Sequence, residues 1–119
     1  TLSSSSAASD VYKRQVELPV EWIRDDAVYF MMNRFGAQRP YTPPADVLDI
    51  FLREFEGAYA EGGMFLLTMH PHVTGYRSRI FILEQLLERI VAKDDCWIAT
   101  HAQIAAYCAE QAGLSNGAS

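Results

Sequence analysis

Apolar and polar residues follow two different periods along this chain. Spacings of three and four predict amphipathic helices over residues 42–61, 79–93 and 100–111. Short apolar or alternating runs predict strands over residues 16–20, 64–69 and 96–99. Strands that alternate with helices pair in parallel through right-handed crossovers. The pattern therefore predicts an α/β fold of about three βα units, too few to close a barrel of ~250 residues, and so the last part of one.

Local signals set the expected ends of these helices. Thr42 is a candidate cap for the first helix, and Gly62-Gly63 ends it. Ser78 is a candidate cap for the second helix, and Thr100-His101-Ala102-Gln103 has the form of a capping box for the third. Residues 22–38 show no clear period, and we expect a loop that leads into a short helical piece.

The two ends of the chain differ in composition from the rest. Residues 1–15 are rich in serine and resemble a translated sequencing-adapter read, so we expect a disordered tail outside the fold. Residues 16–112 form the expected folded portion, and residues 113–119 a flexible tail. On this interpretation the chain is a C-terminal fragment whose natural upstream part is missing.

Charge and composition exclude several classes of protein. The 119 residues carry a formal charge of -5 and no basic stripe, which argues against a nucleic-acid surface. No apolar run reaches the ~18 residues of a transmembrane helix, so no membrane partner is expected. Cys96 and Cys108 match no zinc or redox spacing, and two free thiols favour a reducing, cytoplasmic compartment. Homo-oligomerisation stays open.

His70 is the residue most suited to chemistry. It ends the apolar run 64–69 and precedes Pro71, which forces a turn. In α/β folds the carboxyl end of a strand is where active sites lie, and an imidazole there is placed to act as a general acid or base. The alternative is a core histidine that donates to a backbone carbonyl. His72 forms a His-x-His pair with it, but a metal site would need a third ligand.

Other candidates surround this histidine in the expected fold. Asp25 and Asp26 follow the first strand, and either carboxylate could fix the tautomer of His70, or the pair could be a solvated loop or a cap. Trp22 is a candidate pocket wall or an ordinary core residue. Arg79 is a candidate substrate-holding residue or a surface ion-pair partner, and His101 lies in the first turn of a predicted helix.

Taken in order, these motifs resemble the C-terminal part of the polysaccharide deacetylase family, which is the NodB-homology fold of carbohydrate esterase family 4. The motifs that carry the resemblance are Val16 to Trp22 with Asp25-Asp26, Leu66 to His72, Gly75 to Ile80 with Leu83-Glu84, and Cys96 to Thr100 with Ile104-Ala105. The branch most similar to the chain holds peptidoglycan-deacetylase-like and allantoinase-like proteins.

The resemblance implies a fold, a reaction and a cofactor. The fold is a distorted (β/α) barrel, and the reaction is metal-dependent hydrolysis of a C–N bond, usually with zinc. His70 corresponds to the acid that protonates the leaving amine, and Asp26, with Asp25 as the alternative, to the carboxylate that orients it. The aspartate pair and His-x-x-x-His ligands of the family have no counterpart here, so we expect the chain alone to bind no catalytic zinc and to be inactive.

Three functions therefore remain as hypotheses. The first is a deacetylase that acts on an N-acetylated sugar or a peptidoglycan-like substrate. The second is an allantoinase-like hydrolase of a small cyclic amide. The third is a non-catalytic small α/β interaction domain.

Overall fold

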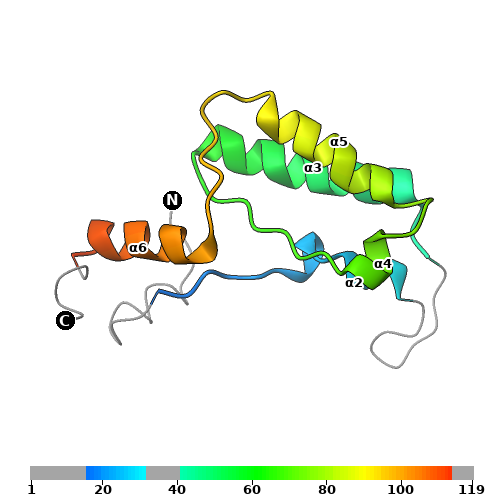
Figure 1. The fold of residues 1–119 in the computed structure, drawn as a ribbon, viewed down its shortest axis with the longest axis horizontal. Helices are drawn as coiled ribbons and strands as arrows, with labels where there is room; N and C mark the ends of the chain where they lie inside the picture. The colour runs from blue at the N-terminus through cyan, green and yellow to red at the C-terminus, as the bar shows by residue number, and fades with distance from the viewer. Residues whose placement is uncertain (1–15, 32–40, 114–119) are drawn as a thin grey trace. The chain divides into compact units, whose positions relative to one another are not determined.

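Helices make up the regular structure of the part of the chain that is described. The computed structural model describes residues 16–31 and 41–113. In chain order the elements are η1 (Trp22–Arg24), α2 (Asp26–Phe30), α3 (Pro44–Glu61), α4 (Pro71–Thr74), α5 (Ile80–Val91) and α6 (His101–Gln111) (Figure 1). No helix in these ranges is long and apolar enough to cross a lipid bilayer.

The chain divides into two compact units. One is Val20–Cys96, and the described residues of the other are 16–19 and 97–113. The tail expected over residues 1–15 lies outside the described residues, as does all but Gly113 of the tail expected over 113–119.

The expected α/β fold and its barrel geometry are wrong for this structure. The strands expected over residues 16–20, 64–69 and 96–99 do not form. In the described ranges there is no sheet, and the one pairing of the β type is an isolated parallel bridge between Asp25 and Thr68. The apolar side chains of Phe65, Leu67 and Met69 pack instead against a core made mainly by helices. The apolar pattern alone cannot show whether such a segment joins a β-sheet. A short apolar segment can bury its side chains equally well against helices, without pairing to another strand.

The first predicted helix is confirmed as α3, with a different start. Pro43 rather than Thr42 is the N-cap residue, and no side chain caps this end. The other end closes as expected: Gly62 has a φ of 69°, which favours glycine, and Gly63 N–H donates to the Ala58 carbonyl over 2.8 Å.

The other two predicted helices are also confirmed. Helix α5 begins at Ile80 with Arg79 as its N-cap residue and no side-chain cap, so the expected role of Ser78 is wrong. Helix α6 has the complete capping box, in which Gln103 N–H donates to Thr100 Oγ1 over 3.1 Å and Thr100 N–H donates to Gln103 Oε1 over 2.9 Å.

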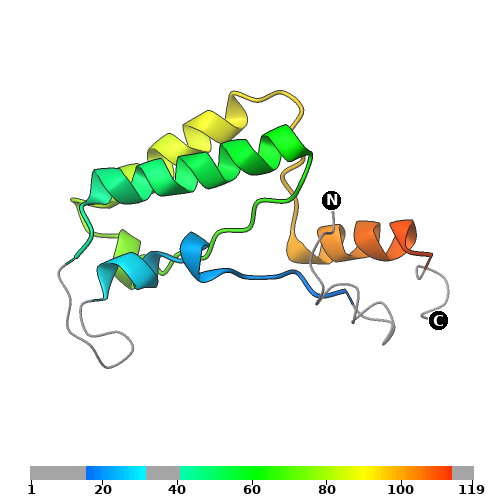
Figure 2. The same ribbon diagram turned by 180° about the vertical axis from the view of Figure 1, so that it is seen from behind.

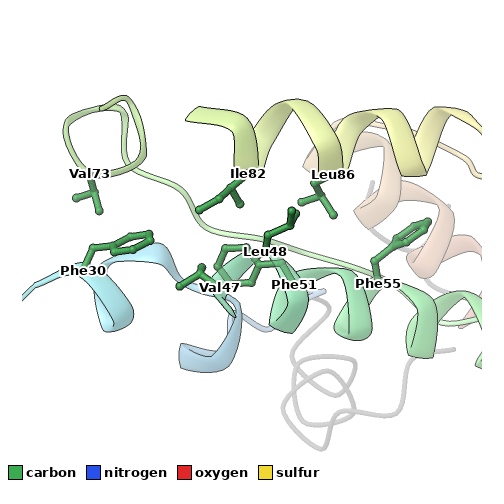
Figure 3. Packing of buried hydrophobic residues seen from close by; sticks show 8 residues of the cluster. All are labelled: Phe30, Val47, Leu48, Phe51, Phe55, Val73, Ile82 and Leu86. Carbon is green, nitrogen blue, oxygen red and sulfur yellow. The ribbon is translucent and has the colours of Figure 1, made fainter. Parts of the chain in front are cut away.

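One hydrophobic core holds the unit Val20–Cys96 together. Helices α3 and α5 lie side by side, while α2 and the single turn α4 contact each other and α4 also contacts α5 (Figures 1 and 2). The buried side chains at the centre come from all four helices, and Figure 3 shows them: Phe30, Val47, Leu48, Phe51, Phe55, Val73, Ile82 and Leu86.

The core also fixes the neighbourhood of His70. Phe30 of α2 faces Val73 of α4 across the core (Figure 3), and both are at least 98 % buried. Complete burial of such a side chain contributes roughly 1.5–3 kcal/mol. The contact holds α2, which begins at Asp26, against the turn that follows His70.

Candidate active site: an aspartate–histidine pair

Backbone pairing brings two distant segments together at the site. Thr68 N–H donates to the Arg24 carbonyl over 2.9 Å, and Asp26 N–H donates to the Thr68 carbonyl over 3.1 Å. Arg24 reinforces the pairing, because its Nε donates to the Leu66 carbonyl over 2.9 Å and one of its terminal nitrogens lies 3.0 Å from Glu54 Oε1. The residues that follow each segment, Asp26 and His70, therefore meet although 44 positions separate them.

Asp26 is a fully buried carboxylate whose two oxygens both accept hydrogen bonds. Oδ1 lies 2.6 Å from His70 Nδ1. Oδ2 accepts the His70 backbone N–H over 2.8 Å and the Thr74 hydroxyl over 2.6 Å. A buried charge without partners would cost several kcal/mol, so these three donors are what permit Asp26 to lie at 0 % exposure.

The contact with Asp26 assigns the tautomer of His70. An ionised carboxylate only accepts hydrogen bonds, so Nδ1 carries the hydrogen in this contact and Nε2 is the ring nitrogen left for other partners. The His70 side chain is 38 % exposed, whereas that of Asp26 is inaccessible. One side of the imidazole is thus anchored in the interior, and the ring remains accessible to solvent.

His70 also has a fixed backbone position. It is the N-cap residue of α4, with φ -113° and ψ 126°, and Pro71 occupies the first helical position. Proline restricts the preceding residue to extended geometry, which matches these angles. The sequence therefore sets the turn at His70 locally, and Asp26 then holds the ring.

Asp25 has a different task from its neighbour. Its Oδ1 accepts the Ala27 backbone N–H over 2.9 Å, so Asp25 caps α2. The same oxygen lies 4.0 Å from His70 Nδ1, beyond hydrogen-bonding distance. Of the two carboxylates that the sequence offers for orienting His70, Asp26 makes the contact.

Asp25, Asp26 and His70 form a possible metal-binding cluster. In the described ranges it is the one group of histidine, cysteine and acidic side chains whose ligand atoms lie close enough to share a metal ion. Ligand atoms of Asp25, Asp26 and His70 all lie within 4.8 Å of one another. Both oxygens of Asp26, His70 Nδ1 and Asp25 Oδ1 are already engaged within the protein. A resident zinc needs at least three protein ligands. A zinc ion here would have to displace the hydrogen bonds that hold Asp26 and His70 together, so the group in this geometry does not fit a zinc site.

The remaining histidines lie in different surroundings. The His72 side chain is exposed, and its ring centroid is 5.7 Å from that of His70 in an edge-to-face arrangement. His101 begins α6 in the other compact unit, so it is not placed relative to the pair.

Arg79 is a partly buried residue that contacts both α2 and the α4 turn. Its guanidinium donates to the Val73 carbonyl over 2.8 Å and lies 4.2 Å from the centroid of the Phe30 ring. The exposed rings of Tyr41 and Tyr76 also flank it, at 4.9 and 5.1 Å. Arg79 therefore ties the end of α2 to the α4 turn.

Trp22, the other residue expected to bind substrate, lies in η1 with 63 % of its surface exposed. An exposed indole of this kind offers a flat apolar surface. This geometry does not test whether Trp22 or Arg79 binds substrate. Their roles in substrate binding stay predictions.

A groove of about 420 Å³ lies apart from these residues. Its lining comes from α3, α5 and the residue after α5: Leu52, Phe81, Glu84, Gln85, Glu88, Arg89 and Ala92. It contains no histidine, so the proton-transfer chemistry of the pair cannot act there.

Thr74 is the site residue that sequence reasoning missed. The signal for it was its position four residues after His70, since side chains four apart lie on the same face of a helix. The spacing alone does not identify Thr74 as a site residue. The identification also needs the Asp26 carboxylate, which contacts both the His70 and the Thr74 side chains.

Comparisons with protein-family models, with curated proteins and with solved structures found no match to this chain.

Proposed function

We propose that Asp26 and His70 form the proton-transfer pair of a hydrolase that cleaves C–N bonds of the amide type. The observation that carries the proposal is the 2.6 Å contact between His70 Nδ1 and a fully buried Asp26, with the imidazole ring still partly exposed. This arrangement orients an imidazole and leaves Nε2 for proton exchange.

The chemistry of amide hydrolysis requires such a group. The nitrogen that leaves must receive a proton as the C–N bond breaks, because an amide anion is a very poor leaving group. In its protonated form His70 holds one hydrogen on Nδ1 against Asp26 and donates the other from Nε2. The negative charge of Asp26 stabilises the imidazolium before the transfer, and the fixed ring orientation aims the proton.

The resemblance to polysaccharide deacetylases suggests the substrate. We infer that it is an N-acetylated sugar or a peptidoglycan-like polymer, with a small cyclic amide as the alternative. Trp22 and Arg79 remain the proposed substrate-binding residues. The free thiols of Cys96 and Cys108 are in keeping with a cytoplasmic location. The described residues do not fit a zinc site, so no step of the proposal passes through a metal.

An interaction domain without catalysis is the second candidate. Several large apolar side chains are exposed, among them Val91 at 68 % and, in the other compact unit, Trp97 at 59 % and Ile98 at 68 %. Exposed apolar surface of this kind is typical of protein-binding faces.

Substitution of the pair tests the catalytic proposal. In protein expressed from the complete coding sequence, His70→Gln and Asp26→Asn should each lower kcat by ~10²-fold or more, because proton transfer contributes about that factor. The assays are acetate release from chitin oligosaccharides and from peptidoglycan, and hydrolysis of allantoin, with and without added zinc.

His72→Gln is the matched control, because it removes an exposed imidazole two residues away without touching Asp26. We expect its kcat to equal that of the unsubstituted protein. Metal content should also be the same in all variants. Turnover that survives His70→Gln in a folded protein would refute the assigned role, and absence of turnover on every substrate would favour the interaction domain.

A further inference from the structure

The Asp26 carboxylate depends on a donor outside the aspartate–histidine pair. Its Oδ2 accepts the Thr74 hydroxyl over 2.6 Å, one of the two shortest contacts that Asp26 makes. Thr74 is 4 % exposed and Asp26 is 0 % exposed. Water therefore cannot easily replace the hydroxyl if it is removed.

The direction of this hydrogen bond follows from chemistry. The ionised carboxylate has no hydrogen to give, so the Thr74 hydroxyl is the donor. Donors to an ionised group form short, strong hydrogen bonds, and 2.6 Å lies in the range for a hydroxyl and a carboxylate.

The α4 turn places Thr74 and His70 on the same carboxylate. Thr74 N–H donates to the His70 carbonyl over 2.9 Å, which closes one helical turn between the two residues. His70 supplies two donors to Asp26, one from the backbone and one from the ring, and Thr74 supplies the third. Any rotation of the Asp26 carboxylate away from His70 would therefore break the Thr74 bond as well.

We propose that Thr74 is a positioning residue, which fixes the Asp26 carboxylate in the one orientation that meets His70 Nδ1. Its effect on catalysis rests on the proposed function of the pair. Its effect on the geometry of the Asp26–His70 pair is independent of that proposed function. Thr74 itself exchanges no proton with a substrate and acts only through Asp26.

Two substitutions separate the hydroxyl from the shape of the side chain. Thr74→Val keeps the branched shape and removes the donor, whereas Thr74→Ser keeps the donor and removes a methyl group. The first readout is the His70 Nδ1 proton in NMR spectra of the 119-residue chain. We expect a downfield, slowly exchanging resonance in the unsubstituted chain and in Thr74→Ser, and its loss or broadening in Thr74→Val.

The second readout is kinetic. With an active protein, Thr74→Val should lower kcat about tenfold or more, which is the scale of a hydrogen bond to a charged group, and should leave KM within about twofold. Thr74→Ser should restore most of kcat. A Thr74→Val variant that keeps the Nδ1 resonance and kcat of the unsubstituted protein would overturn the proposal.

A measurement on the unsubstituted chain guards against a variant that fails to fold. A Thr74 hydroxyl that donates to a buried carboxylate exchanges slowly and should give its own proton resonance. Absence of that resonance at low temperature would also overturn the proposal. If the NMR results hold but no substrate is turned over, the positioning role stands and the proposed hydrolase function fails.

Discussion

At the scale of single residues, two adjacent aspartates have separate tasks. Asp26 is buried and accepts hydrogen bonds from three donors. Asp25 is partly buried at the N-terminal end of α2, where it accepts the Ala27 backbone N–H. The sequence marks both as candidates for orienting His70, because neighbouring carboxylates are chemically equal. The difference arises because the bridge to Thr68 fixes the backbone, which leaves the Asp26 side chain facing the core.

The capping role of Asp25 can be tested by stability. Asp25→Ala removes the acceptor for Ala27 N–H and should lower the free energy of unfolding by about 1 kcal/mol. Asp25→Asn keeps an oxygen acceptor and should cost less than half as much. Urea denaturation at neutral pH measures both. Equal losses in the two variants would show that the charge near His70, and not the cap, is what matters.

At the scale of elements, the amphipathic helices were predictable and the strands were not. The apolar stripes of α3 and α5 and the capping box of α6 are local signals, and the structure confirms all three helices. The apolar run that ends at Met69 has no local feature that distinguishes a strand from irregular chain. Its side chains can be buried against helices as well as in a sheet. The barrel inferred from alternating elements is wrong for that reason.

The pairing of α3 with α5 gives a prediction about pH. Glu56 on α3 lies 2.9 Å from a terminal nitrogen of Arg89 and 3.1 Å from Lys93 Nζ. Hydrogen bonds from Arg89 first, and then from Lys93, lower the pKa of the Glu56 carboxyl below its ordinary value. A lowered pKa stabilises the fold at a pH above the ordinary carboxyl value, and this contribution is lost as the pH falls through the depressed value.

Glu56→Gln should therefore lower the melting temperature at pH 7 by a few degrees at most, since the pair is partly exposed. The difference from the unsubstituted chain should shrink as the pH falls below the ordinary carboxyl pKa of 4.5 and then vanish. Thermal melts by circular dichroism across this range measure it. Glu61→Gln, on the exposed end of the same helix, is the control, and an equal effect there would contradict the assignment to the Arg89 and Lys93 contacts.

At the scale of the whole molecule, the core and the candidate site belong to one compact unit. All eight residues of the core cluster, together with Asp26, His70 and Thr74, lie within Val20–Cys96. Helix α6 with its capping box belongs to the other unit. The hydrogen bonds that hold Asp26 against His70 and Thr74 therefore join residues of this unit alone.

We expect a polypeptide of residues 20–96 to fold by itself. It should melt cooperatively and show the same His70 Nδ1 resonance as the 119-residue chain, because the groups that fix Asp26 and His70 are all present. Circular dichroism and NMR measure the two properties. Loss of cooperative melting in the shorter polypeptide, with the longer chain still cooperative, would show that the second unit supports the first.

Local features of this protein could be predicted from residues that are close together along the chain. These are the three long helices, the turn that Pro71 forces at His70, and the choice of His70 and the aspartates as candidates. Each depends on neighbours within a few positions, where spacing and capping chemistry act directly. The tertiary structure alone decided that no sheet forms in the described ranges, that Asp26 contacts His70, and that Thr74 completes the carboxylate's hydrogen bonds. Those contacts join residues as many as 48 positions apart. The backbone pairing of residues 24–26 with Thr68, together with the packing of α2 against α4, brings them within reach.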